Sequence, residues 1–88
     1  MSISVRVRYF AAAADAAGRD EETLTLPAPS SVGDVKDQAA AAHGAELARV
    51  LDLCSFLLNG QASEADAPLA AGADGEVRLD VLPPFAGG

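Results

Sequence analysis

The stretch ISVRVRYF, residues 3–10, decides the fold, because apolar and polar side chains alternate along it. A period of two is typical of a β-strand that buries one face and exposes the other. The apolar residues at the odd positions are therefore predicted to point into a core: Ile3, Val5, Val7 and Tyr9. The stretch EVRLDVL, residues 76–82, repeats this alternation near the other end of the chain.

The residues that follow the first strand predict a short helix and a second strand. Residues 11–17 are mostly alanine, which favours a helix, and Gly18 is suited to a left-handed helix end. Residues 23–26 alternate again and stop at Pro27, which cannot donate a hydrogen bond to a sheet. Together these segments predict an antiparallel strand pair with a short helical connection.

The main helix is predicted from Ser31 to about His43. Ser31 can accept hydrogen bonds from the free amides of the first turn, and Asp34 is favourable at the positive end of the helix dipole. Gly44 provides the stop, and a second helical piece is expected over residues 46–51. The face predicted to lie on the sheet consists of Val32, Val35, Ala39 and Ala42.

A third strand is predicted over residues 54–58, and it ends at a turn formed by Asn59 and Gly60. Phe56 and Leu58 are expected to face the core. Residues 63–68 are expected to form a polar loop, after which Leu69 returns to the core, and residues 73–75 to form a turn before the last strand.

The order of elements is strand, strand, helix, strand, strand. Because the first and last strands have the strongest patterns, they are expected to lie side by side and parallel at the sheet centre. The predicted fold is α+β, a ubiquitin-like β-grasp with a mixed sheet of four to five strands and one main helix across one face. Residues 1–82 form this domain, and residues 83–88 form a flexible tail.

Composition excludes several classes of function. The 88 residues carry six Lys and Arg against thirteen Asp and Glu, so the net charge of −7 disfavours nucleic acids and anionic membranes and favours a basic protein partner. A single cysteine and a single histidine leave no basis for a metal site or an internal disulfide. No apolar run is long enough for a signal peptide or a membrane span, so we expect a cytoplasmic protein.

The ending PPFAGG, residues 83–88, predicts a segment that reaches into another molecule. Pro83 and Pro84 favour extended backbone, so the segment should leave the last strand straight. Gly87 and Gly88 form the thinnest backbone that a chain offers, and they could enter a channel that any Cβ would block. No constellation of catalytic side chains is visible, so the chain is not expected to be an enzyme.

Several segments together resemble the ubiquitin-like sulfur carriers of the MoaD/ThiS family, most closely the small subunits of molybdopterin synthase. The matching segments are VRVRYFA at 5–11 with the helix to Gly18, SVGDV at 31–35, LLNG at 57–60, DGEV at 74–77 and LPPFAGG at 82–88. Each is weak alone, whereas a strand followed by Pro-Pro and Gly-Gly is a strong match. The resemblance spans essentially the whole chain.

The resemblance implies a function in which the carboxylate of Gly88 is the working group. A partner adenylyltransferase, similar to ubiquitin-activating enzymes, would adenylate it with ATP, after which it becomes a thiocarboxylate. The tail would then enter the large subunit of molybdopterin synthase and supply sulfur to a pyranopterin precursor of molybdenum cofactor. The inserted residues would be Pro84, Phe85, Ala86 and Gly87, and no cofactor is expected to be bound.

Two alternatives remain open. Sulfur carriers for thiazole or cysteine biosynthesis end in comparable tails, although a length of 88 residues and the helix after the first strand favour the molybdopterin branch. In a different class, a ubiquitin-like module would use the tail for protein conjugation or simply for docking.

Two further side-chain features suggest roles. Phe10, Leu57 and Leu82 are predicted to lie on the sheet face away from the helix, where an apolar cluster would dock a partner. The alternative is that single exposed apolar residues are ordinary, or that a shift of one residue in strand register buries them. Cys54 is expected to be an inert residue near the core rather than a nucleophile that handles sulfur.

Overall fold

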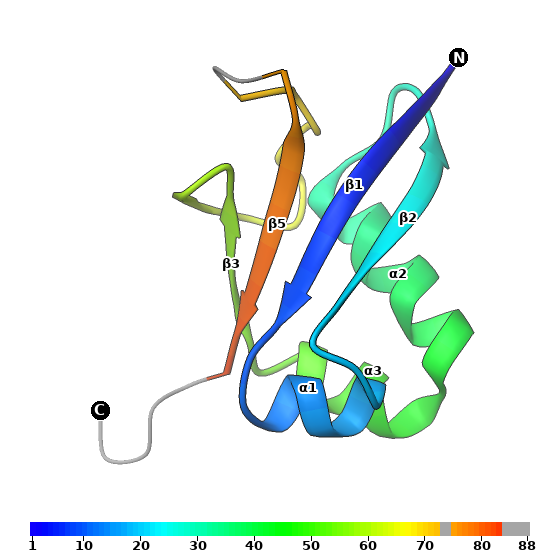
Figure 1. Ribbon diagram of the computed structural model, residues 1–88, viewed down its shortest axis with the longest axis vertical. Coiled ribbons are helices and arrows are strands. Elements are labelled where there is room, and N and C mark those ends of the chain that lie inside the picture. Colours follow the sequence, from blue (N-terminus) through cyan, green and yellow to red (C-terminus); the bar gives the residue numbers. More distant parts are fainter. Residues whose placement is uncertain (73–74, 84–88) are drawn as a thin grey trace.

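The computed structural model describes residues 1–72 and 75–83, and in them a mixed sheet packs against helices on one face (Figure 1). The elements are β1 (Ser2–Tyr9), α1 (Ala12–Ala17), β2 (Glu21–Pro27), α2 (Val32–His43), α3 (Ala45–Leu51), β3 (Ser55–Leu58), β4 (Gln61–Ser63) and β5 (Val77–Leu82). The strand order is β2-β1-β5-β3-β4. This arrangement confirms the predicted β-grasp.

The two strands with the strongest alternation lie next to each other at the centre of the sheet. β1 and β5 are parallel, with Val7 beside Leu79 and Tyr9 beside Val81. β2 pairs with β1 and β3 pairs with β5, both antiparallel. Parallel neighbours need a long crossover, and here the crossover includes the main helix α2 and the strands β2, β3 and β4.

The core lies between the sheet and the helices, and the predicted alternation is confirmed. The odd positions of β1 are buried from Val5 to Tyr9, while Ile3 is partly buried and packs against the core. The other core residues are Ala13, Ala17, Leu24, Leu26, Val32, Val35, Ala39, Leu47, Leu51, Phe56, Leu79 and Val81. Leu58 and Leu69 pack against this cluster, as expected, although each stays partly exposed.

The start of α2 follows the prediction closely. The Ser31 side chain accepts a hydrogen bond from the backbone N–H of Asp34, and the Asp34 carboxylate accepts one from the backbone N–H of Ser31. This reciprocal capping box satisfies two amides that the helix itself leaves without partners.

The end of α2 corrects the prediction for Ala42, which is exposed. The inward position of the last turn belongs to His43, four residues after the buried Ala39. Residues four apart share a helix face, and so do residues three apart. The sequence pattern therefore did not determine whether Ala42 or His43 would face the sheet.

β4 is a strand that the sequence did not predict. Asn59 and Gly60 have φ values of 51° and 86°, so a tight turn reverses the chain and Gln61–Ser63 pairs antiparallel with β3. No residue of β4 is buried, and an edge strand without a buried face leaves no apolar alternation in the sequence. The expected turn at 73–75 falls partly on residues 73 and 74, which lie outside the described residues.

A polar cluster lies where β1, β2 and the end of α2 meet. The Tyr9 hydroxyl donates a hydrogen bond of 2.6 Å to Glu22 Oε2, and His43 Nε2 lies 2.6 Å from the same oxygen. Arg19 Nη1 lies 3.6 Å from the other carboxylate oxygen. Because the Glu22 and His43 side chains are only 11% and 12% exposed, these contacts join β1, β2 and α2 away from solvent.

The surroundings of Glu22 favour its charged form. Burial acts to raise its pKa, but the hydrogen bonds from Tyr9 and His43 and the positive charges of His43 and Arg19 outweigh burial, so the pKa is lowered. Burial and the Glu22 carboxylate raise the pKa of Tyr9, so its hydroxyl keeps the proton that it donates. A carboxyl whose pKa is lower in the folded state stabilises the fold above its unfolded pKa, and this contribution is lost as the pH falls.

We predict that Glu22→Gln lowers the free energy of unfolding by about 2 kcal/mol at pH 7, because hydrogen bonds to a charged group are lost. The difference from the unmodified chain should shrink below about pH 4.5, the ordinary pKa of this group, and vanish once Glu22 is protonated in the folded state. Urea unfolding at several pH values measures it.

Glu21→Gln is the matched control, since the neighbouring Glu21 is exposed. It should change the stability by less than about 0.5 kcal/mol. Equal effects of the two variants, or a Glu22 effect that persists undiminished at low pH, would contradict this account of the cluster.

Candidate functional site: the C-terminal end of β5

The candidate site begins where β5 ends, at Leu82 and Pro83. β5 lies between β1 and β3 and is hydrogen-bonded on both sides, so its end has a fixed position and direction. Figure 1 shows this end at the lower edge of the sheet, close to the start of α1. Whatever follows Pro83 therefore starts from a strand that is paired on both sides.

The predicted tail residues are Pro84, Phe85, Ala86, Gly87 and Gly88, and all of them lie outside the described residues. Their assignment as the inserted segment, and that of Gly88 as the reacting group, remain predictions. The structure describes the base from which they extend.

Two of the three predicted docking residues meet at this base. The backbone N–H of Phe10 donates to the carbonyl oxygen of Val81 at 3.2 Å, which places Phe10 beside Leu82. Leu57 lies one row further along the sheet, opposite Asp80. All three residues lie on the open face, as predicted, but each is half-buried.

The half-burial of Phe10 has a visible cause. The Arg8 guanidinium lies over the Phe10 ring, 5.2 Å from its centroid, and Arg8 Nε is 3.8 Å from Asp80 Oδ1. A guanidinium at this distance attracts the ring face. Arg8 therefore ties the apolar residues at the end of β5 to the charged residues beside them.

Leu53, which was not among the predicted docking residues, is 67% exposed. Leu53 lies in the turn between α3 and β3, two residues before Ser55, which pairs with Leu82. Because this exposed leucine leads into the strand that pairs with the end of β5, we add it to the candidate docking surface. A signal existed, because Leu53 is an apolar residue between a helix pattern that ends at Leu51 and a strand pattern that begins at Cys54.

Cys54 lies near this end but lacks the environment of a nucleophile. Its thiol is half-buried and donates a hydrogen bond to the carbonyl oxygen of Val50 at 3.1 Å. Burial raises the pKa of the Cys54 thiol, and the opposing effect of the Lys36 charge is smaller. Since the thiolate is the reactive form, these contacts support a structural role.

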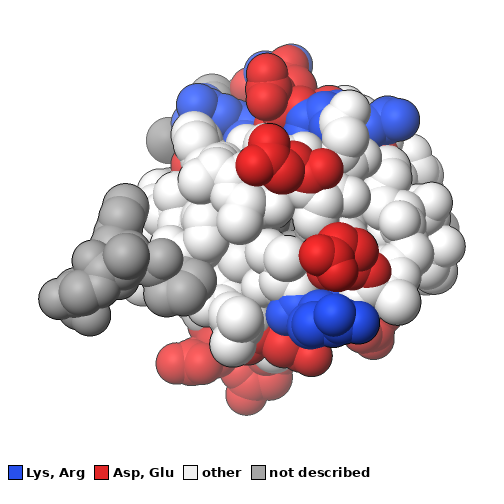
Figure 2. All heavy atoms as spheres, turned by 90° about the horizontal axis from the view of Figure 1, so that it is seen from below, with Lys and Arg blue, Asp and Glu red and all other residues white. Residues whose placement is uncertain are grey.

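The surface at this end is unevenly charged. Figure 2, which views the molecule from below, shows acidic side chains mainly at the top and bottom of the view, interspersed with Lys and Arg, and a broad uncharged area between them. Within residues 1–72 and 75–83, no three His, Cys, Asp or Glu side chains are grouped so that they could hold a metal ion. Nor do the described residues include a helix of the length and apolarity that crossing a membrane requires.

The model of the ThiS family matches residues 7–88, from the middle of β1 to the last glycine. The chain belongs to the ThiS family. A comparison with curated protein sequences gave no match.

Solved structures agree with this membership. The crystal structure of SAMP1 from Haloferax volcanii has a TM-score of 0.80 at 29% identity, over 97% of this chain and 99% of that one. A protein from Pyrococcus furiosus, described as a candidate subunit 1 of molybdopterin converting factor, has a TM-score of 0.77 at 26% identity, over 94% and 99%.

A third structure shares the fold. The complex of subunits 1 and 2 of the molybdopterin-converting factor from Helicobacter pylori 26695 gives a TM-score of 0.58 at 24% identity, over 98% of this chain and 100% of that one. Together with the family match, these findings confirm the predicted MoaD/ThiS resemblance. This ThiS-family chain is a sulfur carrier of that type or a ubiquitin-like modifier.

We predict that Cys54 is slow to react, since burial disfavours its thiolate. Alkylation of the folded chain by iodoacetamide at pH 7.5 should be at least about tenfold slower than alkylation of the same chain in urea. Intact-mass analysis over time measures both rates. Equal rates in the two conditions would show that Cys54 is an accessible, reactive thiol and would reopen a role in handling sulfur.

Proposed function

We propose that this chain is a sulfur carrier of molybdopterin biosynthesis, the small and non-catalytic subunit of molybdopterin synthase. In this proposal the carboxylate of Gly88 is adenylated and then converted to a thiocarboxylate, which donates its sulfur. The observation that carries the proposal is the family match, which covers residues 7–88 and therefore includes both β5 and the Gly-Gly ending.

The chemistry explains why activation is needed. An α-carboxyl group has a pKa of roughly 3.3–3.7, so it is an anion at neutral pH and resists nucleophilic attack. In adenylation a carboxylate oxygen bonds to the α-phosphorus of ATP, and pyrophosphate leaves. Sulfide supplied by a sulfur donor can then attack the acyl carbon and displace AMP, and the product is a thiocarboxylate.

The fold supplies the position for this chemistry. Gly88 lies five residues after Pro83, and a chain of five residues spans at most about 18 Å. A partner must therefore bring its active site to within that distance of the end of β5. The apolar residues around this end, among them Phe10, Leu82 and Leu53, are the surface on which we place the partner; Leu57 lies one row beyond.

Two partners follow from the proposal, both in the cytoplasm. An adenylyltransferase similar to ubiquitin-activating enzymes would bind ATP and activate Gly88. The large subunit of molybdopterin synthase would receive the thiocarboxylate. The Pyrococcus furiosus structure, 26% identical, is described as subunit 1 of a converting factor, which supports a role as one subunit of an assembly.

One alternative has a specific observation in its favour. The structures with 29% and 27% identity are both of SAMP1 from Haloferax volcanii, which is described as a small archaeal modifier protein. A modifier would use the same adenylated carboxylate, but a lysine amine of another protein would take the place of the sulfur donor. The two functions therefore share the first step and differ in the nucleophile.

The test is intact-mass analysis of the chain after incubation with its adenylyltransferase, ATP and a sulfur donor. We predict a mass increase equal to the replacement of one oxygen by sulfur. Covalent adducts on lysines of other proteins, with no thiocarboxylate, would instead establish the modifier. An unchanged mass with no adducts would contradict both functions.

Two variants locate the reacting group in the same experiment. One alanine appended after Gly88, or deletion of Gly88, should abolish the mass change. Neither should alter the thermal midpoint by more than about 1 °C, because chain ends contribute little to the core. A lower midpoint would show that Gly88 serves the fold, and an unchanged reaction would show that the reactive group lies elsewhere.

A further inference from the structure

The sequence contains a single lysine, Lys36, while the other five of its six Lys and Arg residues are arginines. The amine of a lysine is a nucleophile once it has lost its proton, whereas an arginine guanidinium keeps its proton in proteins. Lys36 therefore carries the only side-chain amine that an activated carboxyl group could acylate. The proposed function creates such a group on Gly88 of the same chain.

Lys36 lies in α2, and a residue at the end of α3 holds its charged end. Lys36 Nζ is 2.7 Å from Asp52 Oδ1, a distance typical of a charge-assisted hydrogen bond. The Lys36 side chain is only 27% exposed, whereas the side chain of Arg49 on α3 is 76% exposed. The stem of Lys36 is thus packed against the protein, and its ammonium group contacts Asp52.

The position of Asp52 is not explained by the helix that it ends. Asp52 is the C-cap residue of α3, and the negative end of a helix dipole disfavours a carboxylate there and favours a cation. The contact that compensates for this position is the one with Lys36.

The ion pair lies near the point where the tail begins. Asp52 is three residues before Ser55, so their Cα atoms are at most about 11 Å apart. Ser55 pairs with Leu82 across the strands, which adds about 5 Å. Gly88 follows Leu82 by six residues, and these span up to about 21 Å, more than the distance of at most about 16 Å from Leu82 to Asp52. The tail is therefore long enough to bring Gly88 to the surroundings of Lys36.

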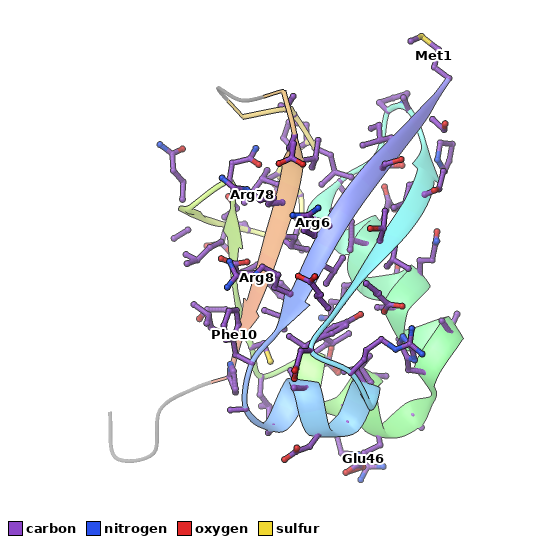
Figure 3. All side chains as sticks on the ribbon, in the orientation of Figure 1. Met1, Arg6, Arg8, Phe10, Glu46 and Arg78 are labelled. Carbon is purple, nitrogen blue, oxygen red and sulfur yellow. The ribbon has the colours of Figure 1, made fainter. Side chains whose placement is uncertain are left out.

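An amine at Met1 is out of reach of the same tail. Figure 3 shows Met1 at the upper end of β1 and Phe10 just beyond its lower end, near the end of β5. Met1 and Tyr9 are eight residues apart along this strand, which is about 26 Å. The residues after Pro83 span at most about 18 Å. Within one chain, Lys36 is thus the amine that the tail can approach.

We propose that the ion pair with Asp52 protects Lys36 from acylation by the activated carboxyl group of Gly88. This inference rests on the proposed function, and it concerns the adenylate that the sulfur carrier and the modifier share. Asp52 acts as a positioning residue, because it holds Nζ against the protein. Its negative charge also repels the phosphate of an approaching adenylate.

The reaction that the ion pair opposes would consume the carrier. Lys36 Nζ would give one proton to water and attack the acyl carbon of the adenylate. A C–N bond would form, the bond from that carbon to the AMP oxygen would break with its electron pair leaving on AMP, and the nitrogen would release a second proton. The product is an amide, within one chain or between two copies, and it can no longer become a thiocarboxylate.

The same protection has a consequence for the modifier alternative. A chain of modifiers would need a lysine of one copy joined to Gly88 of the next, and Lys36 is the only lysine of the sequence. Protection of Lys36 therefore predicts that a target lysine carries a single copy rather than a chain.

The first experiment measures the reactivity of Lys36 without any enzyme. The unmodified chain and Asp52→Asn are acetylated with N-hydroxysuccinimidyl acetate, and the loss of tryptic cleavage at Lys36 is followed over time by mass spectrometry. We expect Lys36 to react about threefold faster in Asp52→Asn, which is the size of effect that one exposed ion pair produces. Circular dichroism checks that the variant keeps the fold.

Glu46→Gln is the matched control. It removes the same charge from α3, and the Glu46 side chain is 70% exposed against 69% for Asp52, but its ion-pair partner is Arg49. Lys36 should react in this variant within about 1.5-fold of its rate in the unmodified chain. In urea all three chains should react equally, because the ion pair is lost with the fold.

The second experiment uses the adenylating enzyme of the same organism with ATP and no sulfur donor. We expect Asp52→Asn to form the amide at least about threefold faster than the unmodified chain. A link within one chain lowers the mass by one water, whereas a link between copies gives the mass of two chains less one water. In both cases trypsin releases residues 79–88 attached to Lys36. Asp52→Asn combined with Lys36→Arg should form no such product.

The outcomes separate this inference from the function on which it rests. Equal acetylation rates in the unmodified chain and Asp52→Asn, an equal gain in Glu46→Gln, or a difference that persists in urea would overturn the protection and leave the proposed function intact. Equally fast amide formation at Lys36 in the unmodified chain and Asp52→Asn would overturn the protection as well. Failure of the unmodified chain to be adenylated would overturn the proposed function, and the acetylation rates would still decide whether Asp52 protects Lys36.

Discussion

The parallel pairing of β1 and β5 is the constraint on which the rest of this molecule depends. It places the first and last strands side by side at the centre of the sheet and requires a crossover long enough to contain the main helix. Because β5 is bonded on both sides, the chain leaves the domain at Leu82 from a fixed point. A carrier needs such a point, since its partner must find the same short segment in the same place on every encounter.

The same pairing organises the surface. The alternation that buries Val7 and Leu79 puts Arg6, Arg8, Arg78 and Asp80 on the open face. One sequence pattern therefore builds both the core and the charged surface of the open face. The apolar residues at the end of β5 meet these charged residues where the Arg8 guanidinium lies over the Phe10 ring. The polar cluster around Glu22 lies on the other face of the sheet, which the helices cover, and there it stabilises the fold without contributing to the open face.

Periodicity predicted the elements that bury one face, and it failed where burial does not follow a pattern. β1, β2, β5 and α2 were recognised because apolar residues recur in them at the spacing of a strand or a helix. β4 has no buried residue, and either Ala42 or His43 fitted the inward face of α2. Alternation also predicts which face of the sheet a residue lies on, but it does not predict which residues lie beside it on the neighbouring strands. The pairing of Arg6 with Arg78 depends on the register between strands from opposite ends of the chain, which only the structure reveals.

The central claim is that β5 is as firmly held as the core, so that it forms a rigid base for the segment beyond it. Native-state hydrogen exchange in increasing denaturant tests this claim most directly. The account predicts that the amides of β5 exchange only through global unfolding, with the same free energy as those of β1. Exchange of the β5 amides at a clearly lower free energy, while β1 and α2 stay protected, would contradict it.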